Sequence, residues 1–220
     1  MADAGRTPRP GRFITLEGGE GAGKSTQRDL LVALLREAGH TVIATREPGG
    51  SPGAEQIRRL LVEGGTGRWE PMTEALLHMA ARRDHIERVI RPALDRGDWV
   101  VSDRFTDSTI AYQGYGHGLG RDAVERLAAA ARIDLSPDVT LILDIPVEDG
   151  LSRTIGRAGA EDRYERMGQV FHASLRAGFL AIAADDPGRC VVIDAAESLD
   201  AVATAIRRAV AARLPEALSA

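Results

Sequence analysis

The sequence of 220 residues contains one cysteine, one lysine and no asparagine. The single Cys190 cannot form a disulfide within the chain or a zinc-binding cysteine cluster, which fits the reducing cytosol. No apolar run approaches the ~18 residues that are needed to cross a bilayer. These absences exclude a disulfide-based scaffold and a membrane-spanning protein, and we expect a cytoplasmic protein without a membrane partner.

Excess positive charge is also absent, because 32 acidic residues outnumber 28 basic ones and the formal net charge is -4. A globally basic nucleic-acid-binding protein is therefore disfavoured, and we expect no nucleic-acid partner. The basic residues are almost all arginine, which a coding bias explains. The position of Lys24 is informative, because a planar guanidinium cannot replace a compact ammonium in a tight site.

Short apolar runs alternate with segments of helical periodicity along the chain, a pattern that predicts one α/β domain. Strands are expected over 13–16, 41–44, 99–101, 139–143 and 190–193. Helices are expected over 24–38, 54–62, 71–96 with a bend near Pro92, 121–132, 146–156, 161–183 and 199–214. Continuous apolar strands favour a parallel sheet that is covered by helices on both faces. We expect residues 1–11 to form a disordered leader and residues 12–220 to form the domain.

A glycine-rich segment between the first strand and the first helix matches the pattern G-x-x-x-x-G-K-[ST]. Its glycines let backbone N–H groups converge on phosphate oxygens, and the helix N-terminus adds its positive end. Lys24 would bridge the β- and γ-phosphates, and the Ser25 hydroxyl would ligate Mg²⁺. The residues predicted to bind ATP are Gly18, Gly19, Glu20, Gly21, Ala22, Gly23, Lys24, Ser25 and Thr26.

The lack of asparagine excludes switch GTPases, whose guanine-reading Asn-Lys-x-Asp motif needs it, and leaves ATP with a second substrate or a partner protein. Polar residues at the carboxyl ends of the strands are candidates for the second site, because ligands bind at that edge of a parallel sheet. Asp103 and Arg104 follow the third strand. The guanidinium group of an arginine can bind a phosphate monoester through two parallel hydrogen bonds. A local salt bridge between Asp103 and Arg104 is the simpler explanation when this pair is considered alone.

Three segments together resemble the thymidylate kinase family, which phosphorylates dTMP to dTDP. They are residues 13–26, the Thr-Arg-Glu-Pro-Gly-Gly segment 45–50 and the Asp-Arg-Phe…Ala-Tyr-Gln-Gly segment 103–114. The resemblance extends from about Arg12 to the C-terminal helix. It implies the P-loop nucleoside-monophosphate kinase fold, with a five-stranded parallel sheet and a short mobile lid at about 153–166. It also implies ATP and dTMP as substrates, Mg²⁺ as cofactor and a homodimer.

The resemblance assigns roles to residues around the acceptor nucleotide. It implies that Arg104 holds the dTMP phosphate and that Tyr112 lies against the deoxyribose. Glu20 would contact the sugar 3′-hydroxyl or a Mg²⁺-bound water, and Asp103 is a second candidate for water-mediated contact with the metal. The other residues implied to bind dTMP are Glu47, Pro48, Arg58, Arg82, Thr109 and Gln113.

His78 departs from the family pattern, because a phenylalanine or tyrosine that stacks on thymine usually occupies this position. An imidazole still stacks, more weakly, and its charge could titrate near neutral pH. The alternative is that a neighbour such as Met79 contacts the base instead.

The expected lid carries a cluster of arginines, for which a solvated charged face is the simpler interpretation. The cluster comprises Arg153, Arg157, Arg163 and Arg166. In the family, members with glycine at the position of Gly21 carry their catalytic arginine in the lid. We therefore expect Arg157 to meet the transferring phosphoryl group, Arg153 to pack on adenine and Asp162 to approach the active centre on closure.

Two other functions remain open. A kinase for another nucleoside monophosphate is favoured only by His78. A P-loop ATPase switch that acts on DNA or a membrane is disfavoured by the acidic net charge and by a second set of phosphate-type arginines, Arg82 and Arg104.

Overall fold

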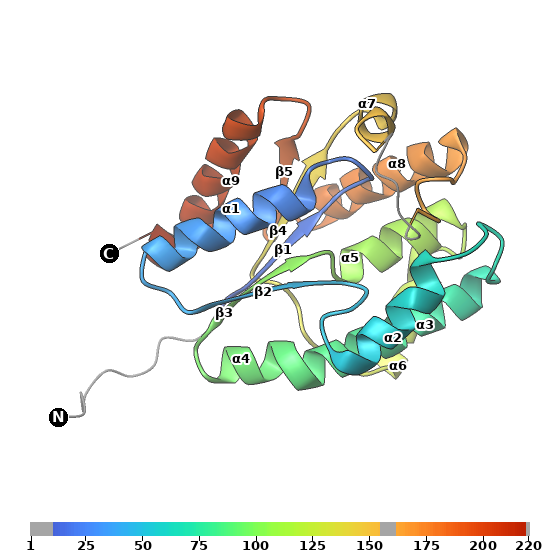
Figure 1. The fold of residues 1–220 in the computed structure, drawn as a ribbon, viewed down its shortest axis with the longest axis horizontal. Helices are drawn as coiled ribbons and strands as arrows, with labels where there is room; N and C mark the ends of the chain where they lie inside the picture. Colours follow the sequence, from blue (N-terminus) through green and yellow to red (C-terminus); the bar gives the residue numbers. More distant parts are fainter. Residues whose placement is uncertain (1–10, 155–161, 219–220) are drawn as a thin grey trace.

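The computed structural model describes residues 11–154 and 162–218 and contains a five-stranded parallel sheet in the order β2-β3-β1-β4-β5 (Figure 1). The strands are β1 (Phe13–Glu17), β2 (Val42–Arg46), β3 (Trp99–Asp103), β4 (Val139–Asp144) and β5 (Cys190–Asp194). Each strand lies within two residues of its predicted position. The register pairs Leu16 with Asp103, so the carboxyl ends of β1 and β3 lie side by side.

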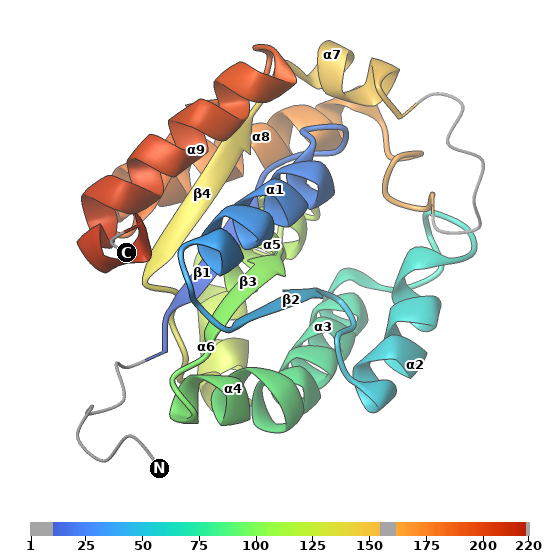
Figure 2. The same ribbon diagram turned by 60° about the vertical axis from the view of Figure 1, so that its left-hand side comes forward.

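Helices cover both faces of the sheet (Figure 2). One face carries α1 (Lys24–Glu37) and α9 (Leu199–Arg213), which contact each other. The opposite face carries α3 (Pro71–His85), η1 (Ile86–Ile90), α4 (Arg91–Asp95), α5 (Thr106–Thr109), η2 (Ile110–Gly116), α6 (Arg121–Ala130) and α8 (Gln169–Asp185). The remaining elements are α2 (Pro52–Val62), which packs on α3, α7 (Val147–Ser152) and the short η3 (Pro215–Leu218).

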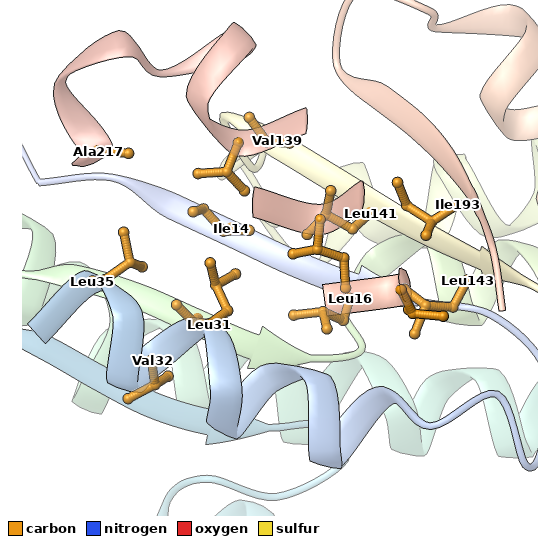
Figure 3. Close-up of a cluster of buried hydrophobic side chains, with 14 of the residues drawn as sticks. Ile14, Leu16, Leu31, Val32, Leu35, Val139, Leu141, Leu143, Ile193 and Ala217 are labelled. Atoms are coloured by element: carbon orange, nitrogen blue, oxygen red, sulfur yellow. The ribbon is translucent and has the colours of Figure 1, made fainter. Parts of the chain in front are cut away.

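The core follows from the alternation of side chains along the buried strands. Ile14 and Leu16 of β1 pack with Leu141 of β4 against Leu31 and Leu35 of α1 (Figure 3). The other residues of β1 face the opposite layer, and they include the polar Thr15 and Glu17, which are fully buried. One face of β1 is therefore apolar, and the other brings polar groups toward the helix that follows β3.

Two predicted helices differ from the structure by more than two residues at one end. The helix predicted over 161–183 begins at Gln169, after Gly168, because residues 163–166 form turns in which the side chain of Arg163 bonds to backbone carbonyls. The helix predicted over 146–156 is α7, which ends at Ser152; residues 155 and 156 lie outside the described chain.

The segment after β3 forms a helix that the pattern did not predict. Residues 106–116 are helical, first as α5 and then as the wider η2. The segment is rich in polar residues and glycine, and its helix is stabilised by burial of Ile110, Ala111 and Tyr112 against α8. The predicted bend near Pro92 is a wide turn in η1, where the Arg91 N–H donates to the carbonyl of Ile86, five residues earlier.

Within the described parts of the chain, no helix has both the length and the apolar character that crossing a bilayer requires.

Candidate active site

The glycine-rich segment forms a tight loop between β1 and α1, as predicted. Gly18, Gly21 and Gly23 have positive φ angles of 131°, 68° and 82°, a conformation that side chains disfavour. A Cβ atom at Gly21 would overlap the carbonyl oxygen of Gly150 in α7. The Lys24 ammonium donates to the Gly19 carbonyl at 2.6 Å and so lies folded over the loop. Residues 18–26 thus form a backbone cradle at the N-terminus of α1.

Ser25 and Asp103 provide oxygen ligands beside this loop. The Ser25 hydroxyl donates to Asp103 Oδ2 at 2.6 Å, because the end of β3 lies next to the end of β1. A hydroxyl and a carboxylate are hard donors that suit Mg²⁺, and Mg²⁺ in such sites takes its other ligands from water and phosphate. Among the described residues, no group of three acidic, histidine or cysteine side chains is arranged to hold a metal ion, and a nucleotide-bound Mg²⁺ does not need one.

Arg104 connects the loop to a second site. Its φ of 71° is left-handed, and its backbone N–H donates to the Leu16 carbonyl at 2.9 Å. One guanidinium nitrogen, Nη1, donates to the Gly18 carbonyl at 2.9 Å and to Ser108 Oγ at 3.1 Å. The other, Nη2, donates to Glu20 Oε1 at 3.2 Å. The strained backbone turns this cation toward the loop and the neighbouring cleft.

Charge pairing sets the protonation states around Arg104. Burial raises the pKa of Glu20, but the charges of Arg104 and Lys24 outweigh it and hold the pKa below its usual range. The Tyr112 hydroxyl donates to Glu20 Oε1 at 2.5 Å, and its ring lies 4.9 Å from the Arg104 guanidinium carbon. Burial, with the charge of Arg104, lowers the pKa of Lys24 to about 8.

The second site is a cleft of about 620 Å³ next to the loop. Its lining includes nine of the residues named from the sequence: Glu20, Glu47, Pro48, Arg58, His78, Arg82, Arg104, Tyr112 and Gln113. The lining also includes Val62, Phe105, Ser108, Tyr164 and Glu165. Thr109 is buried beside the cleft without lining it, and its role near the base stays a prediction.

The floor of the cleft is a buried ionic network. Arg82 Nε donates to Glu47 Oε2 at 2.6 Å, and Arg82 Nη2 donates to the Phe105 carbonyl at 2.9 Å. His85 contacts Glu47 Oε1 at 2.9 Å and the Thr45 hydroxyl at 2.7 Å through its two ring nitrogens. His85 is fully buried, and both of its ring nitrogens are used within this network. Arg58 donates to the Pro48 carbonyl at 2.8 Å and closes the rim.

Glu74 is the central residue that sequence reasoning missed. It is fully buried and accepts hydrogen bonds from Gln113 Nε2 at 2.8 Å, from the Tyr164 hydroxyl at 3.0 Å and from Arg163. Burial raises its pKa, but hydrogen bonds from His117 and Arg163 and the nearby charges lower it to about 2. Glu74 lies one helical turn before His78, and this spacing was the available signal.

His78 and Gln113 are two uncharged polar residues of the cleft wall. The ring of His78 contacts the Tyr164 hydroxyl at 3.0 Å through Nε2, and burial lowers its pKa to about 4, so the ring is neutral near pH 7. Gln113 is fully buried, and its Oε1 atom has no hydrogen-bond partner in the described chain. This amide oxygen is an acceptor available to a ligand.

The expected lid residues have different environments. Arg157 lies outside the described residues. Arg163 is fully buried and donates to the carbonyls of Leu61, Gly65 and Thr66, so it does not reach toward ATP in this structure. Arg153 is exposed, and it donates to the Ala195 carbonyl at 2.9 Å in the loop after β5. Asp162 accepts from Arg166 at 3.0 Å and does not line the cleft.

A parallel sheet with a phosphate-binding loop and a second, arginine-lined cleft at the same edge defines the class of P-loop nucleoside-monophosphate kinases. Within it, residues 16–206 match the family model described as thymidylate kinase. The chain therefore belongs to the thymidylate kinase family.

Similar proteins agree with this assignment. The chain is 57% identical to the thymidylate kinase of Caulobacter vibrioides over 93% of this chain and 98% of the relative. It is 52% identical to the thymidylate kinase of Bradyrhizobium sp. strain BTAi1 over 100% of this chain and 99% of the relative. The crystal structure of thymidylate kinase from Ehrlichia chaffeensis superimposes with a TM-score of 0.73 at 35% identity, covering 90% of this chain and 98% of that one.

Proposed function

We propose that the protein transfers the γ-phosphoryl group of ATP to dTMP and releases dTDP and ADP. The observation that carries the proposal is the position of Arg104, whose guanidinium contacts both the Gly18 carbonyl of the loop and the wall of the cleft. A triphosphate in the loop and a monophosphate in the cleft would therefore meet at one cation. Catalysis in this arrangement is by positioning and charge neutralisation.

The donor side is formed by the loop. Backbone N–H groups of residues 18–26 and the Lys24 ammonium hold the ATP phosphates, and phosphate binding replaces the contact of Lys24 with Gly19. Ser25 and Asp103 would hold Mg²⁺, directly and through water. A Mg²⁺ ion held by these residues would supply positive charge against the charge that develops on the phosphate oxygens.

The acceptor side is formed by the cleft. Arg104 and Arg82 fix the dTMP phosphate, and Gln113 Oε1 accepts a hydrogen bond from the thymine N3–H. Tyr112 lies against the deoxyribose, where its hydroxyl on Glu20 leaves no room for a ribose 2′-hydroxyl. His78 contacts the base as a neutral ring, through its face. Glu47, Pro48 and Arg58 enclose the nucleotide, with Thr109 behind the wall.

The lid supplies the remaining charge. Arg157 contacts the transferring phosphoryl group, Arg153 packs on adenine at the loop after β5, and Asp162 approaches on closure. The steric exclusion of a side chain at Gly21 supports this assignment, because the loop itself cannot present an arginine at that position. We further propose a cytoplasmic homodimer, to which α3 contributes exposed apolar side chains such as Leu76.

The experiment is a measurement of ADP release with ATP, Mg²⁺ and each candidate acceptor. We expect release that requires both dTMP and Mg²⁺, with dTDP as the second product and EDTA abolishing turnover. A higher kcat/KM with another nucleoside monophosphate would establish the alternative kinase. ATP hydrolysis without dTMP that DNA stimulates would establish the ATPase switch.

A further inference from the structure

Glu17 is a buried carboxylic acid to which neither the sequence nor the proposed reaction assigns a role. It is the last residue of β1, is fully buried and faces the helix that follows β3. Its Oε1 atom accepts the backbone N–H of Phe105 at 2.7 Å, and its Oε2 atom accepts the Ser108 hydroxyl at 2.5 Å. Both partners follow Arg104, whose left-handed backbone turns its side chain toward the cleft.

Ser108 connects Glu17 to the cleft. Its Oγ atom also accepts a hydrogen bond from Arg104 Nη1 at 3.1 Å, and its side chain lines the cleft. A serine hydroxyl has one hydrogen to donate. While Glu17 is ionised, that hydrogen points to Glu17, and the cleft meets only an oxygen lone pair. A phosphate oxygen that approaches beside Arg104 would then face an acceptor instead of a donor.

Several charges act on Glu17 from the surrounding elements. Burial, and the negative charge of Asp107, raise its pKa to about 8, and the hydrogen bonds from Ser108 and Phe105 and the charge of Arg104 oppose this rise. Lys24 at the start of α1 and Cys190 of β5 also interact with it. A phosphate dianion beside Arg104 would add negative charge and favour protonation of Glu17 further.

Asp107 differs from Glu17 because its partner is a cation. It is bonded to the Arg189 guanidinium at 2.5 Å and 3.1 Å, which stabilises its charge. Glu17 has hydrogen-bond donors but no direct contact with a cation among the described residues. It is therefore the carboxylate of this pair that responds to a new anion.

We propose that Glu17 is a positioning residue that takes up a proton when dTMP binds and thereby turns the Ser108 hydroxyl toward the acceptor phosphate. The proton comes from solvent and stays on Glu17 Oε2, from which it donates to Ser108 Oγ. The Ser108 hydrogen then donates to a phosphate oxygen, while Arg104 keeps its contact with Ser108. This inference rests on the proposed function, because it needs a phosphate monoester in the cleft.

The test is isothermal titration calorimetry of dTMP binding at pH 8 in two buffers with different ionisation enthalpies. At pH 8 the second proton of the phosphate, with a pKa of about 6, is already lost. A group with a pKa of about 8 is then half-protonated, so we expect an uptake of up to roughly half a proton on Glu17. The Glu17→Gln variant should lack this uptake and keep dTMP binding, because its amide accepts from Phe105 and donates to Ser108.

The decisive quantity is the difference in proton uptake between wild type and Glu17→Gln, because Lys24 also titrates near pH 8 in both proteins. Asp138→Asn is the matched control: Asp138 accepts the backbone N–H of Phe13 at 2.7 Å, at the opposite end of β1. We expect this control to show wild-type proton uptake. Thermal unfolding of each variant establishes that it is folded before titration.

A second readout is the KM for dTMP between pH 7 and pH 9. In the wild type we expect KM to rise with pH as Glu17 loses its proton, and in Glu17→Gln and Ser108→Ala we expect a flatter profile. Ser108→Ala should also have the higher KM at pH 7. Equal proton uptake in wild type and Glu17→Gln would overturn the inference while leaving the kinase intact. Failure of dTMP to bind at all would overturn the proposed function instead.

Discussion

At the scale of single residues, burial and partners decide which cleft groups are charged. Glu74 and Glu20 keep their charge despite burial because each accepts hydrogen bonds and faces cations. His78 loses its charge because burial outweighs the attraction of Glu74. The neutral His78 ring therefore adds no charge to this wall of the cleft near neutral pH.

The His78→Phe variant tests this interpretation through stability. The pKa of His78 is about 4 in the folded protein and near 6.5 in the unfolded chain, so the unfolded chain binds more protons between these values. Wild-type stability is therefore lost as pH falls from 6.5 toward 4, by up to about 1.4 kcal/mol per pH unit. Phenylalanine does not titrate. We expect urea unfolding to show that the variant's free energy of unfolding, relative to wild type, increases from pH 7 to pH 5; a constant difference would contradict the depressed pKa.

At the scale of elements, the side chain of Arg163 attaches the segment before α8 to the α2–α3 connection, and the exposed Arg166 adds a hydrogen bond to the Gly64 carbonyl. The Arg163 guanidinium is fully buried, and it donates to the carbonyls of Gly65 and Thr66 in that connection. It also donates to the carbonyl of Leu61 at the end of α2 and to the carboxylate of Glu74, and both of these hydrogen bonds are buried. This contact places Tyr164 in the cleft wall beside His78. A prediction that groups Arg163 with exposed lid arginines is wrong here, because helical spacing carries no information about a turn that inserts into another element.

Substitution of Arg163 by methionine should destabilise the protein strongly. The change leaves the Glu74 charge buried and the carbonyls without their donor, which costs about 3–5 kcal/mol. Chemical denaturation measures the loss, and Glu74→Gln in the same chain should recover part of it. Arg166→Met is the control, because Arg166 is exposed: its pair with Asp162 contributes about 0–1 kcal/mol, and its hydrogen bond to the Gly64 carbonyl is also open to solvent. Similar losses of stability in Arg163→Met and Arg166→Met would show that the buried contacts of Arg163 contribute no more than the exposed contacts of Arg166.

At the scale of the whole molecule, apolar layers on both faces stabilise the sheet. The polar residues of the candidate site lie at the carboxyl ends of its strands. The layer between the sheet and helices α1 and α9 includes Leu141, whose side chain is fully buried (Figure 3). The opposite layer joins α8 to η2 around Phe179 and Ile182. These layers hold β1, β3 and β4 in register, so that the residues at their ends converge.

Leu141→Ala should lower the free energy of unfolding by about 2–5 kcal/mol, because a buried leucine leaves a cavity when it is truncated. Leu199→Ala makes the same chemical change at a residue that is 53% exposed, and we expect a shift of about 0.5 kcal/mol or less. Equilibrium denaturation of the two variants gives the comparison. Equal losses would show that the layer against α1 and α9 does not carry the stability that its burial implies.

The sequence by itself determined the five strands, the parallel α/β class and the phosphate-binding loop. Those features depend on local signals: an apolar run, a glycine pattern, and polar residues at strand ends that parallel pairing must bring to one edge. Most of the cleft residues were implied by the resemblance to the thymidylate kinase family, and three of them, Arg58, His78 and Arg82, lie in helices. The tertiary structure alone decided the roles of Glu74, Arg163, Glu17 and Ser108. Their partners lie far away along the chain, as with Glu17 and Ser108, which are 91 residues apart. Burial and hydrogen bonding between such distant segments set the charge of a side chain, and no local pattern records which segments will meet.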